Sequence, residues 1–180
     1  YGGVNDDHNA GIMRYVSIRH SGTNIGEGNE INGLTLGGIG SATIIDHVEV
    51  ISNADDGFEF FGGRVNAKHL IASFCSDDAF DYDEGYSGKG QFWAGIQDNQ
   101  EGSLLLEANG GSYPENGRPL STPLLYNLTL VGSGRSNDRV QAVYSRNAGG
   151  VLANSVLRAE LARACDDSGL RLFLCPRAYC

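Results

Sequence analysis

The apolar and polar residues in the middle of the chain follow a pattern that repeats every 22 positions. Residues 46–50 (DHVEV) align with residues 68–72 (KHLIA), and the same offset aligns residues 55–60 with residues 77–82 without a gap. Inside each copy, apolar residues occupy every second position, as in a β-strand. A fixed period in the low twenties predicts stacked rungs of β-structure.

Two earlier segments extend the pattern toward the start of the chain. Residues 15–20 (YVSIRH) alternate in the same way, and residues 33–36 (GLTL) match residues 57–60 (GFEF), with an expected loop over residues 23–30. Side chains of a strand alternate between its two faces. The alignment therefore predicts two inward columns and one outward column, which are Leu34, Phe58 and Phe80; Leu36, Phe60 and Tyr82; and Thr35, Glu59 and Asp81.

The pattern weakens after residue 96 and resumes near residue 124. The intervening residues are mostly polar and rich in Gly and Asn, so we expect residues 97–123 to form a surface excursion. Residues 158–180 carry three of the four cysteines, and we expect them to form a C-terminal cap. The whole chain, residues 1–180, is then a single domain.

These observations predict the fold class. The repeat is too short for a propeller blade and lacks the leucine pattern of leucine-rich repeats. In a parallel β-helix, each coil pairs with the next at about 4.8 Å, which places equivalent residues in columns. An antiparallel sandwich gives no reason for such columns. We predict an all-β, right-handed parallel β-helix with rungs of about 22–25 residues.

Composition and charge narrow the classes of partner. The net charge of −9 and the pI of about 4.8 argue against nucleic-acid binding, which needs Lys and Arg beside the phosphates. An acidic surface suits secreted or cell-surface proteins that meet hydrated sugars and divalent cations. No apolar run approaches the roughly 18 residues of a membrane helix, so we expect no membrane span.

The four cysteines leave two interpretations open. Cys75 stands alone, whereas Cys165, Cys175 and Cys180 lie close together near the end of the chain. An even number of cysteines fits disulfides formed in an oxidising compartment. Unpaired thiols in a reducing compartment are the alternative.

Several segments together carry a resemblance to a known family. They are residues 1–3 (YGG), 11–19 (GIMRYVSIR), 29–38 (NEINGLTLGG), 55–63 (DDGFEFFGG) and 85–89 (GYSGK). With them the chain resembles secreted, right-handed parallel β-helix repeat proteins of bacteria, of the hypothetical-protein or lipoprotein type with a pectin-lyase-like fold. Such proteins usually carry further turns before the Tyr-Gly-Gly segment. The resemblance thus implies the C-terminal portion of a longer domain.

Acidic residues also fall into columns one rung apart, with Asp55, Asp56 and Glu59 aligned to Asp77, Asp78 and Asp81. Like charges about 5 Å apart repel by on the order of 1 kcal/mol in water and by more in a less polar environment. Something in the protein must offset this repulsion.

Three interpretations of the acidic columns stay open. Asp side chains at corners can accept hydrogen bonds from backbone N–H groups one or two residues further on. Alternatively, a cluster of carboxylates can bind calcium, and the expected ligands are Asp56, Glu59, Asp78 and Asp81. The third interpretation is catalysis on a polysaccharide, similar to the paired acidic rungs of polygalacturonases, with Asp55, Asp56, Asp77 and Asp78 as the acids.

Two further groups of residues each have two interpretations. His47 and His69 stack one rung apart, either as a solvated pair or as a metal site. Trp93 and Tyr86, together with Phe92 and Tyr82, form either the edge of the aromatic core or a glycan-binding platform.

The sequence thus leads to a function hypothesis and an alternative. The leading hypothesis is a secreted or cell-surface β-helix module for adhesion or glycan contact, stabilised by calcium and not catalytic. The alternative is a polysaccharide hydrolase or lyase that uses the stacked acids. We also expect self-association through the open ends of the coil, because unpaired strand edges attract further strands.

Overall fold

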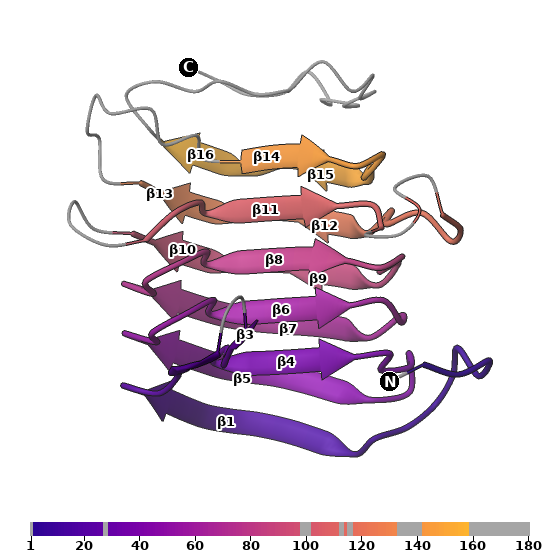
Figure 1. Cartoon of the computed structure of the whole chain (residues 1–180), viewed down its shortest axis with the longest axis horizontal. Helices are drawn as coiled ribbons and strands as arrows, with labels where there is room; N and C mark the ends of the chain where they lie inside the picture. Colours follow the sequence, from indigo (N-terminus) through magenta and orange to yellow (C-terminus); the bar gives the residue numbers. More distant parts are fainter. Residues whose placement is uncertain are drawn as a thin grey trace.

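The structure, a computed structural model, describes residues 2–26, 29–97, 102–111, 114, 117–132 and 142–158. Over these residues the chain winds in successive coils (Figure 1). The coils contribute strands to a nine-stranded sheet and to a five-stranded sheet, and neighbouring coils pair in parallel. The described residues contain strands and no helix. The predicted all-β parallel β-helix is confirmed.

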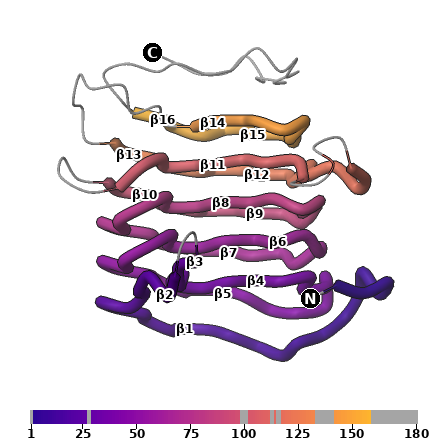
Figure 2. Tube along the Cα trace, in the orientation of Figure 1, coloured from indigo at the N-terminus to yellow at the C-terminus, as the bar shows by residue number. Residues whose placement is uncertain are grey.

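The strands of the nine-stranded sheet are β1 (Ile12–Arg19), β5 (Ile44–Ile51), β7 (Asn66–Ser73), β9 (Lys89–Gln91), β10 (Ala94–Ile96), β12 (Leu124–Tyr126), β13 (Thr129–Val131), β15 (Val151–Ala153) and β16 (Val156–Arg158). Those of the five-stranded sheet are β4 (Leu34–Gly37), β6 (Phe58–Phe61), β8 (Phe80–Asp83), β11 (Leu106–Asn109) and β14 (Ala142–Ser145). The short antiparallel pair β2 (Asn24–Gly26) and β3 (Asn29–Glu30) lies in the expected loop. Figure 2 shows the coils rising from indigo β1 to yellow β16.

The register of the middle rungs agrees with the sequence repeat. Asp46 of β5 pairs with Lys68 of β7, and Phe58 of β6 pairs with Phe80 of β8, each 22 residues further along. The offset grows to 35 residues between Lys89 and Leu124 because long connections flank β11. The regular period therefore belongs to the middle of the coil.

The inward columns form a stacked core. Phe58 and Phe80 are fully buried, and their ring centroids are 5.5 Å apart. Trp93 packs on Phe80 at 4.9 Å and on Phe60 at 5.3 Å. Tyr86 also packs on Phe60, at 4.7 Å. Offset aromatic pairs of this kind contribute about 0.5–1.5 kcal/mol each beyond the burial of apolar area.

The strands of the nine-stranded sheet bend at one shared position. His47 in β5 and His69 in β7 have left-handed backbone angles, with φ of 54° and 53°. The bend interrupts the alternation, so Ile45 and Val48 both point inward while the two residues between them face outward. In later coils the bend divides the strand in two, as between β9 and β10. Strict alternation, which the sequence pattern predicts, therefore fails at this column.

The excursion predicted for residues 97–123 needs correction. This segment contains β11, which pairs with β8 and β14, and its residues Leu106 and Ala108 are fully buried. The chain thus completes another rung here instead of leaving the core. The predicted cap and its three cysteines lie outside the described residues apart from Arg158, and Cys75 is a buried free thiol. No helix of the described chain is long and apolar enough to cross a membrane.

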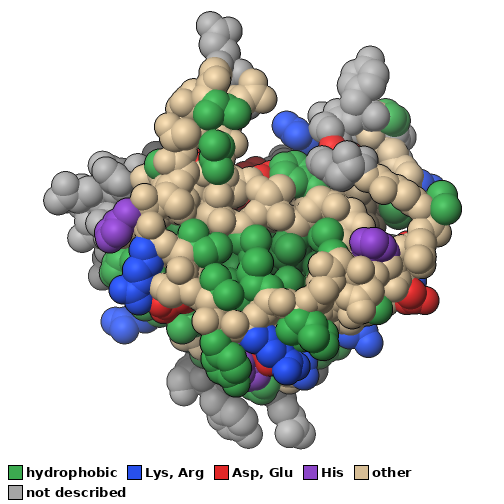
Figure 3. Space-filling model, turned by 90° about the horizontal axis from the view of Figure 1, so that it is seen from below, with side chains coloured by type: hydrophobic (Ala, Val, Ile, Leu, Met, Phe, Trp, Pro, Cys, Tyr) green, Lys and Arg blue, Asp and Glu red, His purple; other side chains and the backbone are tan. Residues whose placement is uncertain are grey.

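The lower end of the coil exposes part of the apolar interior. Seen from below, hydrophobic side chains fill the centre of the molecule inside a frame of backbone and polar groups (Figure 3). Met13, Val16, Ile18 and Leu34 are only partly buried here and pack on the core above. Within the described residues, β1 and β4 pair on their upper side only. We name these four side chains the lower face.

Candidate functional site

The acidic columns meet on the outer side of the five-stranded sheet. Glu59 of β6, Asp81 of β8 and Glu107 of β11 occupy equivalent positions in consecutive rungs. Glu59 keeps part of its surface exposed, but Asp81 is only 7% exposed although its strand position faces outward. The sequence pattern did not predict Glu107 as part of this acidic column, because its rung lies in the segment that we expected to be a surface excursion. An alignment that allowed a gap after Asp83 would have found it.

The corner residues Asp56 and Asp78 tie one rung to the next. Asp56 Oδ1 accepts a hydrogen bond from the backbone N–H of Asp78 at 2.9 Å, and Asp78 Oδ1 accepts one from Leu104 at 2.6 Å. The sequence predicts caps within the same turn, one or two residues away, and Asp55 has a backbone hydrogen bond of this kind with Asp56. The bonds of Asp56 and Asp78 instead reach the next coil, because the stacked corners place its N–H group directly beside the carboxylate.

Burial and the closeness of other acids raise the pKa values of the acidic residues on this sheet and at its corner. Burial, then the nearby Glu107 and Glu59, raises the pKa of Asp81 to about 8. Burial and the nearby Asp83 raise the pKa of Glu59 to about 7, although Asn32 donates a hydrogen bond to it. Burial is also the main cause that raises the pKa of Asp78 to about 9. These raised pKa values mean that the acids bind a proton or a cation more readily than free carboxyl groups do.

The cluster has the ligands that a hard cation prefers. Carboxylate oxygens of Asp56, Glu59 and Asp81 lie within 4.8 Å of one another. Asp81 Oδ1 is buried and has no hydrogen-bond partner among the described residues, and the same is true of Asp83 Oδ1. Calcium binds six to eight oxygens, mostly from carboxylates and carbonyls. The donor set and the unpartnered oxygens therefore fit calcium.

The four expected calcium ligands do not form a single group. Asp56, Glu59 and Asp81 make one set, whereas Asp78 joins Asp56 and Asp77 in a second set. Asp56 belongs to both. We define the first set as the acidic cluster.

The expected catalytic acids are mostly withdrawn from solvent. Asp78 is only 2% exposed, and Asp55 and Asp56 are also buried. Asp77 lies nearer the surface, beside Asp55 and Glu30. Burial, then the Glu30 charge, raises the pKa of Asp55 to about 6. The chain brings these four acids together at one corner, but the cap bonds of Asp56 and Asp78 occupy one oxygen of each.

The bend column carries a stack of four exposed rings. Tyr15 lies on His47 at 4.8 Å, His47 on His69 at 4.2 Å, and His69 on Phe92 at 5.2 Å between ring centroids. All four residues have left-handed backbone angles, which are uncommon for bulky side chains. In the next two coils the same position holds Asn127 and Asn154, a residue type that tolerates this conformation well. We name the four rings the ring column.

A groove of about 440 Å³ runs along the ring column and is lined mainly by apolar atoms. Its polar edge includes Glu49, which accepts hydrogen bonds from Ser17 and from Arg19, each at 2.6 Å. Tyr15 is 78% exposed and Phe92 is 46% exposed. The groove therefore combines ring faces with a hydrogen-bonding edge.

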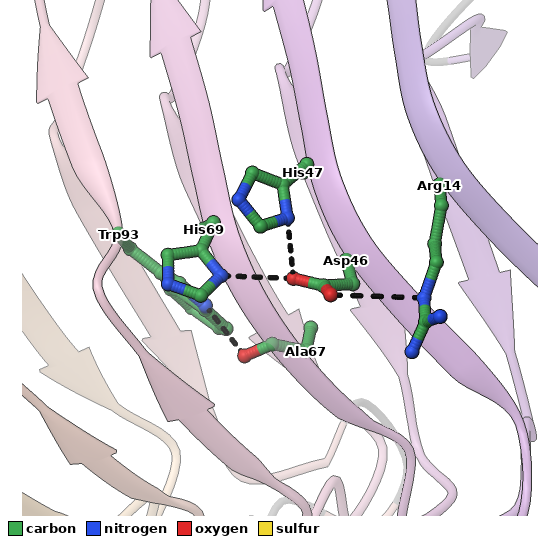
Figure 4. Close-up of polar contacts among 6 residues, drawn as sticks. All are labelled: Arg14, Asp46, His47, Ala67, His69 and Trp93. Carbon is green, nitrogen blue, oxygen red and sulfur yellow. Dashed lines mark hydrogen bonds and ion pairs between the residues drawn. The ribbon is translucent and has the colours of Figure 1, made fainter.

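The glycan platform predicted at Trp93 and Tyr86 is wrong. Trp93 is 1% exposed and donates its indole N–H to the Ala67 carbonyl at 3.0 Å (Figure 4). Tyr86 is fully buried, and its hydroxyl donates to the Val65 carbonyl at 3.0 Å. The bend turns Phe92 outward and Trp93 inward. Of the rings expected in the platform, Phe92 is the exposed one, and it stands in the column that contains His47 and His69.

One carboxylate holds both histidines of the ring column. Asp46 Oδ1 lies 2.9 Å from His47 Nδ1 and 2.8 Å from His69 Nδ1, and Arg14 Nε lies 3.7 Å from Asp46 Oδ2 (Figure 4). The hydrogen bond with His69, followed by the nearby His47, His69 and Arg14, lowers the pKa of Asp46. Asp46 is thus a carboxylate at neutral pH.

The fold and these side chains define a parallel β-helix protein with an acidic cluster on one sheet and a ring column on the other. A comparison with protein-family models matches residues 1–168 to the pectate-lyase-like β-helix domain, and the chain belongs to this family. Neither the comparison with curated proteins nor the one with solved structures gives a match. The resemblance to pectin-lyase-like β-helix proteins is confirmed at the level of the family.

Proposed function

We propose that this protein is a secreted or cell-surface β-helix module that contacts glycans and does not turn them over. The observation that carries the proposal is the ring column along its groove. Aromatic faces are apolar and carry partial negative charge, so they pack against the C–H faces of sugar rings. Glu49 and Ser17 at the edge of the groove supply hydrogen-bonding groups for sugar hydroxyls.

Calcium has a structural part in this proposal. The acidic cluster of Asp56, Glu59 and Asp81 holds the ion, which offsets the repulsion between neighbouring rungs. The unpartnered Asp81 oxygen supports this assignment. The cluster lies on the other sheet from the ring column, so calcium stabilises the coil and takes no part in glycan contact.

The alternative function is hydrolysis or cleavage of a polysaccharide at the corner of Asp55, Asp56, Asp77 and Asp78. It is favoured by the pKa of Asp78, which is raised to about 9, because a carboxyl group that keeps its proton at neutral pH can act as a general acid. The small exposure of Asp78 weighs against it.

A glycan array together with an activity screen separates the two functions. We expect the protein to retain specific glycans without releasing products. Tyr15→Ala and Phe92→Ala weaken this binding, because each removes an exposed ring of the groove. Tyr126→Ala and Phe74→Ala are matched controls, since both rings are exposed but lie outside the groove.

Two results would overturn the proposal. Binding that survives the loss of both Tyr15 and Phe92 would place the glycan elsewhere. Turnover by the wild type that is lost in Asp56→Asn and Asp78→Asn would establish the enzyme instead.

A further inference from the structure

We propose that Asp46, His47 and His69 form a binding site for a divalent transition metal such as Zn²⁺, separate from the acidic cluster and located within the ring column. The three side chains offer two imidazole nitrogens and one carboxylate oxygen within 4.8 Å of one another. This mixture of donors suits zinc, whereas calcium prefers oxygen alone. The site is therefore chemically distinct from the acidic cluster.

The separation of the donor atoms is close to what a metal requires. Zinc bonds of about 2.0–2.2 Å place neighbouring ligand atoms about 3.3 Å apart around a tetrahedral ion. Asp46 Oδ1 lies 2.9 Å and 2.8 Å from the two Nδ1 atoms. If each of these two distances grows by about half an ångström, the ion can replace the protons that now lie between the oxygen and the nitrogens. The two imidazole planes are only 23° apart in their stack, so each ring also has to turn about its Cβ–Cγ bond to aim its Nδ1 lone pair at a shared ion.

The surrounding contacts hold the donors in place before the metal arrives. Tyr15 and Phe92 stack on the outer faces of the two imidazoles and keep both rings beside Asp46. Arg14 lies against Asp46 Oδ2 and leaves Oδ1 facing the rings (Figure 4). A charged partner such as Arg14 helps to orient a ligating carboxylate and strengthens metal binding.

The site is also open to solvent. The side chains of His47 and His69 are 43% and 40% exposed, and that of Asp46 is 23% exposed. A metal can therefore enter without unfolding the strands. With three protein ligands, the fourth position of a tetrahedral ion stays free for water or for a ligand, as in zinc sites that are not purely structural.

The test is titration of the full chain with Zn²⁺ by calorimetry, comparing the wild type with His47→Asn, His69→Asn and Asp46→Asn. Asparagine occupies the bend position in later coils, so the two histidine variants keep a backbone conformation that the fold accepts. We expect each variant to weaken zinc binding at least about tenfold. His20→Asn is the matched control, because His20 is exposed and has a left-handed backbone but lies outside the cluster.

Spectroscopy with Co²⁺ distinguishes this site from binding by the cysteines. Cobalt bound by nitrogen and oxygen gives no sulfur charge-transfer band, whereas cobalt bound by thiolates gives one. Circular dichroism checks that each variant is folded. Unchanged zinc affinity in the folded histidine variants, or a cobalt spectrum with only the sulfur band, would overturn the proposal and leave Asp46, His47 and His69 as a hydrogen-bonded cluster.

Discussion

Asp81 shows how much the position of a single carboxylate matters in a stacked coil. It lies between Glu59 and Glu107 and has one oxygen without a partner. In a single isolated strand the same residue would point into water and stay ionised. Here the neighbouring rungs both remove its water and add negative charge, and both effects favour the protonated form.

The first prediction concerns pH without calcium. The folded pKa values of Asp81 and Glu59, about 8 and about 7, lie above their ordinary values of 3.8 and 4.5. The stability that these groups contribute is fully present below the ordinary values and is lost as the pH rises through the folded ones. In the presence of a chelator, the free energy of unfolding should thus fall between about pH 5 and pH 8, as measured by denaturant titration.

Calcium should reverse this loss at the upper end of the pH range. A ligand present at about 100 times its Kd adds about 2.7 kcal/mol to the free energy of unfolding. Asp81→Asn should remove most of the calcium effect and flatten the pH dependence, whereas Asp7→Asn, at an exposed site, should change neither. Equal stabilisation of the wild type and Asp81→Asn by calcium would contradict the assignment.

At the bend, the sequence pattern does not predict which of two neighbouring aromatic side chains faces the solvent. Phe92 and Trp93 are neighbours, and simple alternation gives no reason to choose which of them faces the solvent. The left-handed backbone at Phe92 decides it, because this bend shifts the alternation by one residue. The bend is a tertiary feature, set by stacking on the coil below, and no Gly or Asn marks it at this position.

At the scale of elements, the same bend yields a prediction about stability. Trp93→Ala removes a buried ring that packs on two phenylalanines, and it should lower the free energy of unfolding by about 3–5 kcal/mol. Phe92→Asn should change it by only about 0.5 kcal/mol, since an exposed ring is replaced by a residue that tolerates the backbone conformation. Chemical denaturation of both variants provides the measurement. A larger loss for Phe92→Asn would show that the ring column supports the fold.

The elements could be predicted from the sequence wherever rungs have equal length. β6 and β8 pair in the register that the 22-residue repeat gives, because no residue is inserted between them. The same alignment did not predict β11, because long connections on both sides of the strand shift its position relative to the repeat. The acidic cluster could be predicted together with β6 and β8, whereas Glu107 and the ring column depended on features that break the regular pattern.

For the molecule as a whole, we expect self-association through the lower face. The unpaired edges of β1 and β4 and the partly exposed Val16 and Ile18 suit a second copy of the chain, whose coil has the same strand spacing. Analytical ultracentrifugation should show an assembly that grows with concentration. Ile18→Asp should shift it toward the monomer, while Ile96→Asp, at an exposed site on the side of the coil, should not. A concentration-independent monomer would refute this expectation.

The uniform register between β5 and β7 and between β6 and β8 also bears on how the chain folds. Each of these pairings closes a loop of the same length, 22 residues, so the entropic cost of adding a coil is equal at each of these steps. Coils of this kind interact only with their neighbours, and folding can start at one pair and spread along the axis. The middle coils therefore form the natural starting point. The longer connections around β11 make the upper coils slower to join them.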